Sequence, residues 1–197
     1  MAQFNPGSDA AHTLRVSSAH EGIGAPSPWL VRFSKLIPAG GNVLDHACGG
    51  GRHARWLARE GFQVEATDRD RAALAGLAGE ANVTAREVDL EQGQWPYAGV
   101  VFDAVVVSNY LFRPRFDLLL EAVAPGGVLI YETFMIGNEK FGKPSNPDFL
   151  LAPGELLQRT AGWHVVAFEQ GVVSAPRNAA IQRICAVNGQ SEGIALP

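Results

Sequence analysis

Residues 42–60 read NVLDHACGGGRHARWLARE, and this stretch decides the fold. We expect a short apolar strand at its start, ending in the carboxylate of Asp45. Glycines follow, and after them apolar residues recur at the spacing of a helix. A strand, a glycine turn and a helix in this order open a nucleotide-binding βαβ unit. Gly49 and Gly51 are expected to admit a ligand to the backbone because glycine has no β-carbon.

The next expected strand, residues 63–67, indicates which ligand binds. It ends in Asp68, nineteen positions after Gly49, where a carboxylate suits hydrogen bonding to a ribose diol. NAD and S-adenosylmethionine both carry this diol, and the turn also fits the dinucleotide pattern G-x-G-x-x-A. Asp45 favours S-adenosylmethionine, because a carboxylate there would repel a pyrophosphate but attract a sulfonium and an ammonium group.

Taken together, the motifs resemble those of the class I (Rossmann-like) S-adenosylmethionine-dependent methyltransferases. LDHACGGGRHARWLA is similar to their first motif, VEATDRD to the second, VDLEQGQWPY to the third and FDAVVVSNYLF to the fourth. APGGVLIYETF is similar to the turn and fifth strand, so that the resemblance covers residues 36–187. The family usually has glycine where this chain has Ala47, and alanine is expected to be small enough to preserve binding.

The resemblance implies an α/β fold with a Rossmann-like, seven-stranded, mostly parallel sheet, helices on both faces and a reversed last strand. The chain supports the reversal independently. Residues 163–173 and 179–187 read as the last two strands, and the link between them is too short for a helical crossover. These two strands must therefore be antiparallel, unlike the corresponding strands of the dehydrogenase fold.

The resemblance also implies a cofactor site at the carboxyl ends of the first four strands. Asp68 would bind the ribose, Asp89 would lie near the adenine amino group, and Leu90 would pack on the adenine ring. The expected cofactor-binding residues are Asp45, Ala47, Cys48, Gly49, Gly51, Arg52, Asp68, Arg69, Asp89, Leu90, Ser108 and Asn109.

Acceptor contacts are expected just after the fourth strand and in residues 135–151, because ligands bind beyond the carboxyl ends of strands in open α/β sheets. Glycines and prolines make residues 135–151 an irregular loop, and loops of this length are usually functional. The alternative is that this loop only covers the core. The expected substrate-binding residues are Tyr110, Arg113, Phe134, Asn138, Phe141 and Asn146.

Methyl transfer from a sulfonium is an in-line displacement that depends mainly on positioning and needs no metal. A general base is needed only if the acceptor arrives protonated. Tyr110, Glu132 and His20 are weak candidates for that base.

The chain has 197 residues, 47% of them hydrophobic, which indicates one domain with a substantial core. Residues 1–26 are expected to form a flexible segment or a lid, residues 27–190 the domain, and residues 191–197 a tail. The net charge is −4 and the basic residues form no run, which argues against general nucleic-acid binding. Cys48 and Cys185 are expected to be free thiols, and no metal-binding cluster is evident.

No apolar run is long enough for a membrane span, and the start of the chain does not read as a secretory signal, so a cytoplasmic location is expected. The sequence thus predicts an S-adenosylmethionine-dependent methyltransferase acting on a small-molecule acceptor, since the chain has no appended recognition domain. Its later segment also resembles, loosely, small bacterial methyltransferases grouped with tellurite-resistance enzymes. Two alternatives stay open, a non-catalytic cofactor-binding subunit and an NAD-dependent oxidoreductase. The sequence leaves the accepting atom and the oligomeric state open.

Overall fold

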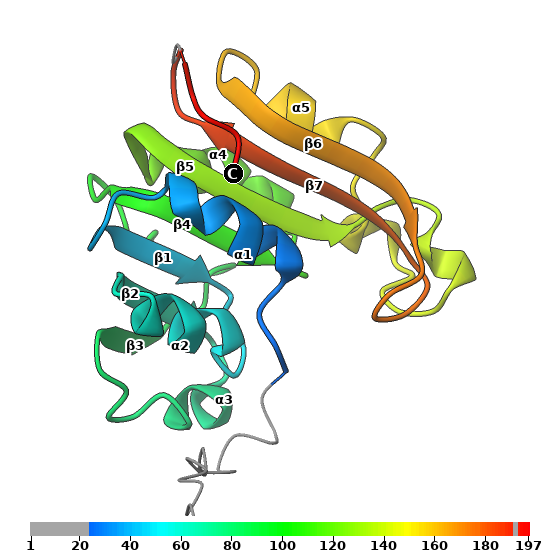
Figure 1. The fold of residues 1–197 in the computed structure, drawn as a ribbon. Helices are drawn as coiled ribbons and strands as arrows, with labels where there is room; N and C mark the ends of the chain where they lie inside the picture. The colour runs from blue at the N-terminus through cyan, green and yellow to red at the C-terminus, as the bar shows by residue number, and fades with distance from the viewer. Residues whose placement is uncertain (1–23, 191–192) are drawn as a thin grey trace, which may run out of the picture.

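The computed structural model describes residues 24–190 and 193–197. It contains a seven-stranded sheet in the order β3-β2-β1-β4-β5-β7-β6 (Figure 1). Its strands are β1 (Asn42–His46), β2 (Gln63–Asp68), β3 (Val83–Glu87), β4 (Phe102–Ser108), β5 (Val123–Phe134), β6 (His164–Val173) and β7 (Ala179–Val187). The neighbouring strands in the row β3-β2-β1-β4-β5 run parallel to one another, whereas β7 is antiparallel to both β5 and β6. The predicted fold class and reversed hairpin are therefore confirmed.

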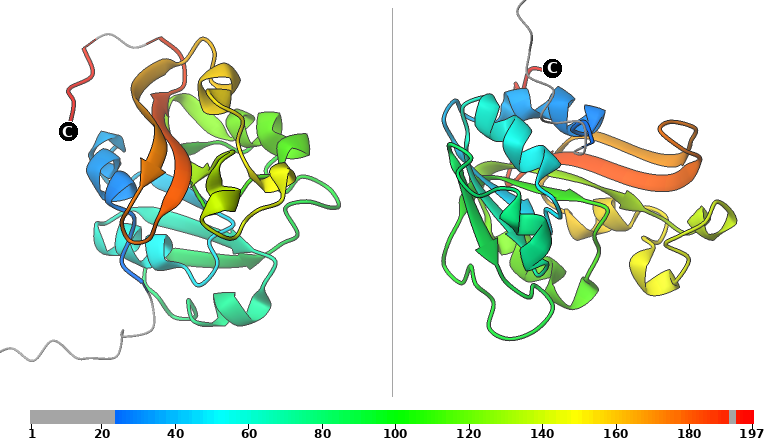
Figure 2. Two further views of the ribbon diagram at one scale, coloured as in Figure 1. Left: turned by 90° about the vertical axis from the view of Figure 1, so that its right-hand side faces the viewer. Right: turned by 90° about the horizontal axis from the view of Figure 1, so that it is seen from below.

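Helices cover both faces of the sheet (Figure 2). Apolar side chains of α1, α2 and α3 join one core cluster, and those of α4 and α5 join the other. Residues 104–107 of β4 are at most 1% exposed, as expected for a strand between two helical layers. The helices are α1 (Pro28–Phe33), α2 (Arg52–Arg59), α3 (Arg71–Ala75), α4 (Phe116–Glu121) and α5 (Glu155–Arg159), and short 3₁₀ turns lie at Ser34–Leu36, Arg113–Arg115, Asn138–Lys140 and Pro147–Phe149.

Helices α3 and α4 on the sheet are short. α3 has only five residues: the Asp70 carboxylate caps its first turn, and two glycines follow its last turn. The 3₁₀ turn at Arg113–Arg115 directly precedes α4. Residues 125–127, a Pro-Gly-Gly sequence, lie within the span of β5, where the register with β4 jumps.

Residues 135–151 form the predicted irregular segment, which we call the β5–α5 loop. It contains two 3₁₀ turns, and it begins and ends at a parallel bridge between Met135 and Leu151. Both ends of the loop are therefore fixed beside the carboxyl end of β5. Among the helices in the described part of the chain, none is both long and apolar enough to cross a bilayer.

Candidate active site

The turn between β1 and α2 combines open space with tight packing. Gly49 and Gly51 have φ angles of 54° and 73°, in the left-handed region that favours glycine. A β-carbon on Gly49 would meet no atom within 4 Å, so this position leaves room beside the backbone, as predicted. A β-carbon on Gly51 would lie 2.5 Å from the Cδ2 atom of Leu77. The expectation that Gly51 makes room for a ligand is therefore wrong, since core packing requires this glycine.

Two carboxylates at neighbouring strand ends shape the same edge of the sheet. Asp68 accepts the amide of Gly49 at 2.8 Å and the amide of Asp70 at 2.9 Å. Asp89, after β3, accepts the amides of Glu91 at 2.8 Å and Gln92 at 3.2 Å. Both carboxylates also line a cavity, so each combines a turn-stabilising contact with a surface open to a ligand.

Asp45 lies at the end of β1, with 1% of its surface exposed. Its Oδ2 atom accepts the amide of Ala54 in α2 at 3.0 Å. Burial raises the pKa of this carboxyl to about 7, although the Ala54 hydrogen bond and the charge of Arg52 lower it. Its ionisation thus responds to any nearby positive charge.

Arg52 and Ser108 join the first turn of α2 to the ends of β4 and β5. Arg52 Nη2 donates to the Ser108 hydroxyl at 3.2 Å, and that hydroxyl donates to Glu132 at 3.4 Å. Arg52 Nη1 donates to the Ala25 carbonyl at 3.2 Å, which brings the segment before α1 to the site. His20, the third candidate base, lies outside the described residues.

Two neighbouring cavities lie along the carboxyl ends of the strands, and they share the backbone positions Ala47 and Asn109 as walls. The first has a volume of about 470 Å³ and is lined by Ala47, Asp68, Arg69, Asp89, Leu90, Glu91, Asn109, Tyr110, Leu111, Thr133, Phe134, Pro144 and Phe149. The second has a volume of about 430 Å³ and is lined by Gly24, Asp45, Ala47, Cys48, Gly49, Gly50, Arg52, His53, Ser108 and Asn109. Of the predicted cofactor residues, all except Gly51 line one cavity or both.

The predicted acceptor residues divide into two groups. Tyr110 and Phe134 line the first cavity, whereas Arg113, Asn138, Phe141 and Asn146 line neither cavity. The Asn138 side chain is buried, and its amide donates to the Pro144 carbonyl and accepts the Ala180 amide. It therefore braces the β5–α5 loop internally, where no ligand reaches it.

Asn146 and Phe141 also lie away from the acceptor wall. Asn146 accepts the amide of Asp148 at 3.1 Å and so caps a turn. Phe141 is 41% exposed at the surface of the β5–α5 loop. The pattern of the sequence could not separate these residues from Pro144 and Phe149, which do line the cavity.

His46 was missed by the sequence analysis. Its ring is buried and meets Tyr110 edge-on, with the ring centroids 5.2 Å apart. Burial lowers the pKa of His46 to about 3, so the imidazole is neutral, and burial also raises the pKa of the Tyr110 phenol. Within the described residues, His46 Nδ1 and the Tyr110 hydroxyl have no hydrogen-bond partner. A single histidine in a strand carries no local signal of this contact.

The sheet order, the reversed hairpin and the acids beside the glycine turn define the class of S-adenosylmethionine-dependent methyltransferases. Residues 18–189 match a family model described as a methyltransferase domain, and the chain belongs to this family. Membership of a methyltransferase family argues against the NAD-dependent oxidoreductase alternative. Within the described residues, no group of three His, Cys, Asp or Glu side chains could hold a metal ion.

Solved structures of methyltransferases share this fold. TehB from Haemophilus influenzae is 19% identical with a TM-score of 0.68, and the match covers 81% of this chain and 61% of TehB. A TehB-like methyltransferase from Corynebacterium glutamicum is 17% identical with a TM-score of 0.60, over 82% of this chain and 87% of its own. The N-methyltransferase NodS from Bradyrhizobium japonicum, in complex with S-adenosyl-L-homocysteine, is 17% identical with a TM-score of 0.63, over 82% and 83%. No curated protein matches the sequence.

Proposed function

We propose that this chain transfers a methyl group from S-adenosylmethionine to a small-molecule acceptor held in the first cavity. The observation that carries the proposal is the composition of that cavity. One side has Asp68, Asp89 and Leu90, and the other has aromatic and apolar side chains from the strand ends and the β5–α5 loop. Its volume of about 470 Å³ falls within the range of small-molecule pockets.

The residues that line the two cavities offer a partner for each part of the cofactor. Asp68 and Asp89 would hold the ribose and the adenine amino group, and the space beside Gly49 would admit the ligand to the backbone. Asp45, Arg52 and Ser108 line the second cavity, where the methionine end would lie with its ammonium and carboxylate groups. The shared walls at Ala47 and Asn109 connect the two ends.

When bound, S-adenosylmethionine supplies an activated methyl group on a sulfonium leaving group. The task of the protein is then to orient the acceptor and to exclude water. Phe134, Pro144 and Phe149 would exclude water from the acceptor side. The Tyr110 phenol stays protonated at neutral pH, since burial raises its pKa, and its hydroxyl is buried with no hydrogen-bond partner among the described residues, so it does not suit a general base. Glu132 remains the described candidate base, in contact with Ser108.

A two-part experiment tests the proposal. Calorimetry should first detect S-adenosylhomocysteine binding, and turnover should then be measured with thiophenol, catechol, aniline and sodium selenite, which offer different accepting atoms. Methylation of at least one compound is expected, together with a higher KM for that acceptor in Phe149→Ala that leaves cofactor affinity unchanged. Binding without turnover of any compound would instead favour the non-catalytic subunit.

The acceptor pocket itself needs a matched control. Phe141→Ala removes a phenylalanine of the same β5–α5 loop that lies outside both cavities. This variant is expected to keep the wild-type KM for the acceptor. An equal rise in acceptor KM in Phe149→Ala and Phe141→Ala would mean that either substitution disturbs the folding of the whole loop. The acceptor would then bind elsewhere.

A further inference from the structure

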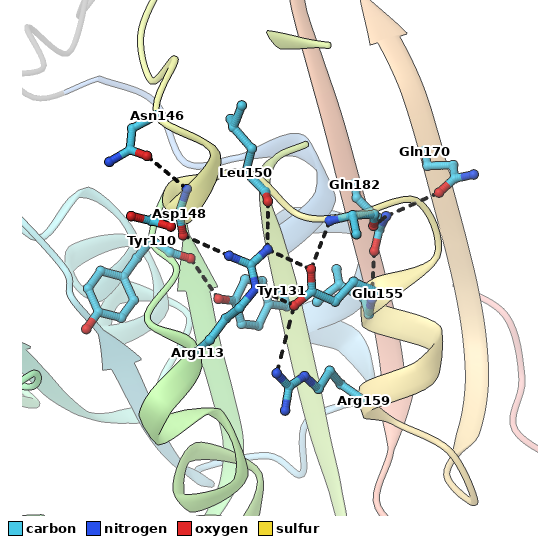
Figure 3. A network of polar contacts seen from close by, with 12 residues as sticks. Tyr110, Arg113, Tyr131, Asn146, Asp148, Leu150, Glu155, Arg159, Gln170 and Gln182 are labelled. Atoms are coloured by element: carbon cyan, nitrogen blue, oxygen red, sulfur yellow. Dashed lines mark hydrogen bonds and ion pairs between the residues drawn. The ribbon is translucent and has the colours of Figure 1, made fainter. Parts of the chain in front are cut away.

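Arg113, in the 3₁₀ turn after β4, connects the strand ends to the β5–α5 loop (Figure 3). Its Nε atom donates to Glu155 Oε1 at 2.8 Å, and its Nη2 atom donates to Glu155 Oε2 at 2.7 Å. Nη1 donates to the carbonyl of Asp148 at 2.9 Å, and Nη2 also donates to the carbonyl of Leu150 at 2.7 Å. The two carbonyls belong to the residues on either side of Phe149.

These contacts leave Arg113 little capacity to bind a substrate. A guanidinium has five N–H donors, and the contacts above use all but one of them. Its side chain lines neither cavity. The role expected from the sequence, direct substrate binding, therefore does not fit the geometry.

Glu155 is fixed as firmly as Arg113. It begins α5, its side chain is only 10% exposed, and its Oε2 atom also accepts the amide of Ala152 at 2.8 Å. The next amide, of Leu156, donates to Gln182 in β7 at 2.7 Å. The start of α5 is thus anchored to the sheet, and its Glu155 carboxylate fixes Arg113, which holds the carbonyls of Asp148 and Leu150 (Figure 3).

We propose that Arg113 is a positioning residue, which sets Phe149 as a wall of the acceptor cavity and thereby tunes acceptor selection without touching the acceptor. Phe149 lines the cavity although 48% of its surface is exposed, so its own packing does little to fix it. The planar fork of arginine reaches two carbonyls and a carboxylate together, whereas the single ammonium of lysine cannot reproduce this geometry. The inference rests on the proposed function, because it assigns the acceptor to this cavity.

Arg113→Lys tests the inference with two independent measurements. Hydrogen exchange should show the Phe149 and Leu150 amides, which donate to Asn146 and Pro147, exchanging at least about tenfold faster. The KM for whichever of thiophenol, catechol, aniline or selenite the wild type methylates fastest should rise about tenfold or more, with kcat and S-adenosylhomocysteine affinity changed by less than about threefold. Glu155→Gln, which keeps the shape but removes the charge, should show the same pattern more weakly.

Arg86→Lys is the matched control. Arg86 pairs with Glu65 at 3.3 Å across the outer strands β2 and β3, and neither residue lines either cavity or belongs to the β5–α5 loop. It should leave both measurements unchanged. Wild-type exchange rates in both Arg113→Lys and Glu155→Gln would overturn the inference, and so would a parallel loss of cofactor affinity. Absence of wild-type turnover would count against the proposed function, while exchange still decides whether Arg113 holds Phe149.

Discussion

The amide of Gly49 donates to the carboxylate of Asp68, with the nitrogen and Oδ2 atoms 2.8 Å apart. This hydrogen bond ties the glycine turn after β1 to the end of β2. The carboxylate that is expected to hold the ribose therefore also shapes the turn beside it. Both contacts depend on the same side chain, so its loss should affect the cofactor site in two ways.

Asp68→Asn removes the charge while it keeps the size of the side chain. The affinity for S-adenosylhomocysteine should fall about ten- to a hundredfold, because hydrogen bonds to charged groups contribute about 1.5–3 kcal/mol. Adenosine alone should lose affinity by the same factor, since the ribose is common to both ligands. Calorimetric titration measures both. Asp70→Asn, which weakens the cap of α3, is the control and should bind S-adenosylhomocysteine with wild-type affinity. Wild-type affinity in Asp68→Asn would show that another residue holds the ribose.

Asp45 should make cofactor binding depend on pH. Its pKa of about 7 in the folded protein lies above the ordinary value of 3.8, so the carboxyl is protonated in mild acid. A cationic ligand favours the ionised form, and affinity should therefore fall about tenfold per pH unit below about pH 7 and level off above about pH 8. Titrations between pH 5.5 and 8.5 check this, and Asp45→Asn should flatten the profile. A pH-independent wild type would exclude the coupling.

Gly49 and Gly51 should respond differently to alanine. Gly49→Ala places a methyl group in open space, so that cofactor affinity should fall while the free energy of unfolding drops only about 1–2 kcal/mol, the cost of a left-handed alanine. Gly51→Ala forces its methyl group against Leu77, which is 1% exposed, and should destabilise the fold by about 2–4 kcal/mol. Urea unfolding and ligand titration separate the effects. Equal loss of stability in both variants would contradict this assignment.

Ala47 adopts a left-handed conformation with a φ of 56°, which explains why glycine suits this position. Ala47→Gly should raise the free energy of unfolding by about 0.5–1 kcal/mol, because the strain it relieves exceeds the added entropy of the unfolded chain. Ala72→Gly, on the exposed side of α3, should instead lower it by about 1 kcal/mol. Urea unfolding measures both free energies. If Ala47→Gly also destabilised the protein, the left-handed backbone of Ala47 would not be strained.

His46 should make the fold sensitive to acid. Its folded pKa of about 3 lies below the ordinary 6.5, so below pH 6.5 the unfolded chain takes up a proton that the folded protein excludes. The stability from this group is present above pH 6.5 and is lost as the pH falls. His46→Phe should therefore gain about 2 kcal/mol relative to the wild type between pH 8 and pH 5. Urea unfolding at both pH values checks this. If the stability difference between His46→Phe and the wild type were the same at pH 8 and pH 5, the imidazole would be protonated in the folded protein as readily as in the unfolded chain.

The sequence alone determined the fold class and most of the residues that line the two cavities at the strand ends. Glycines, strand-end acids and apolar runs are local features, and parallel strands bring their carboxyl ends to one edge wherever the sheet forms. Asp45, Asp68 and Asp89 could thus be placed from their positions at strand ends alone. The short link before residue 179 likewise required a reversed hairpin, because no helical crossover fits there.

Only the tertiary structure decided which side chains face the acceptor cavity. The β5–α5 loop has no periodicity, so its sequence could not distinguish Phe149, at the cavity wall, from Phe141, at the surface. Arg113 and Glu155 are 42 residues apart, and packing of α5 against β7 brings them together. The same holds for Gly51, whose need for glycine comes from Leu77 across the core. Such contacts depend on distance in space, which a local pattern does not encode.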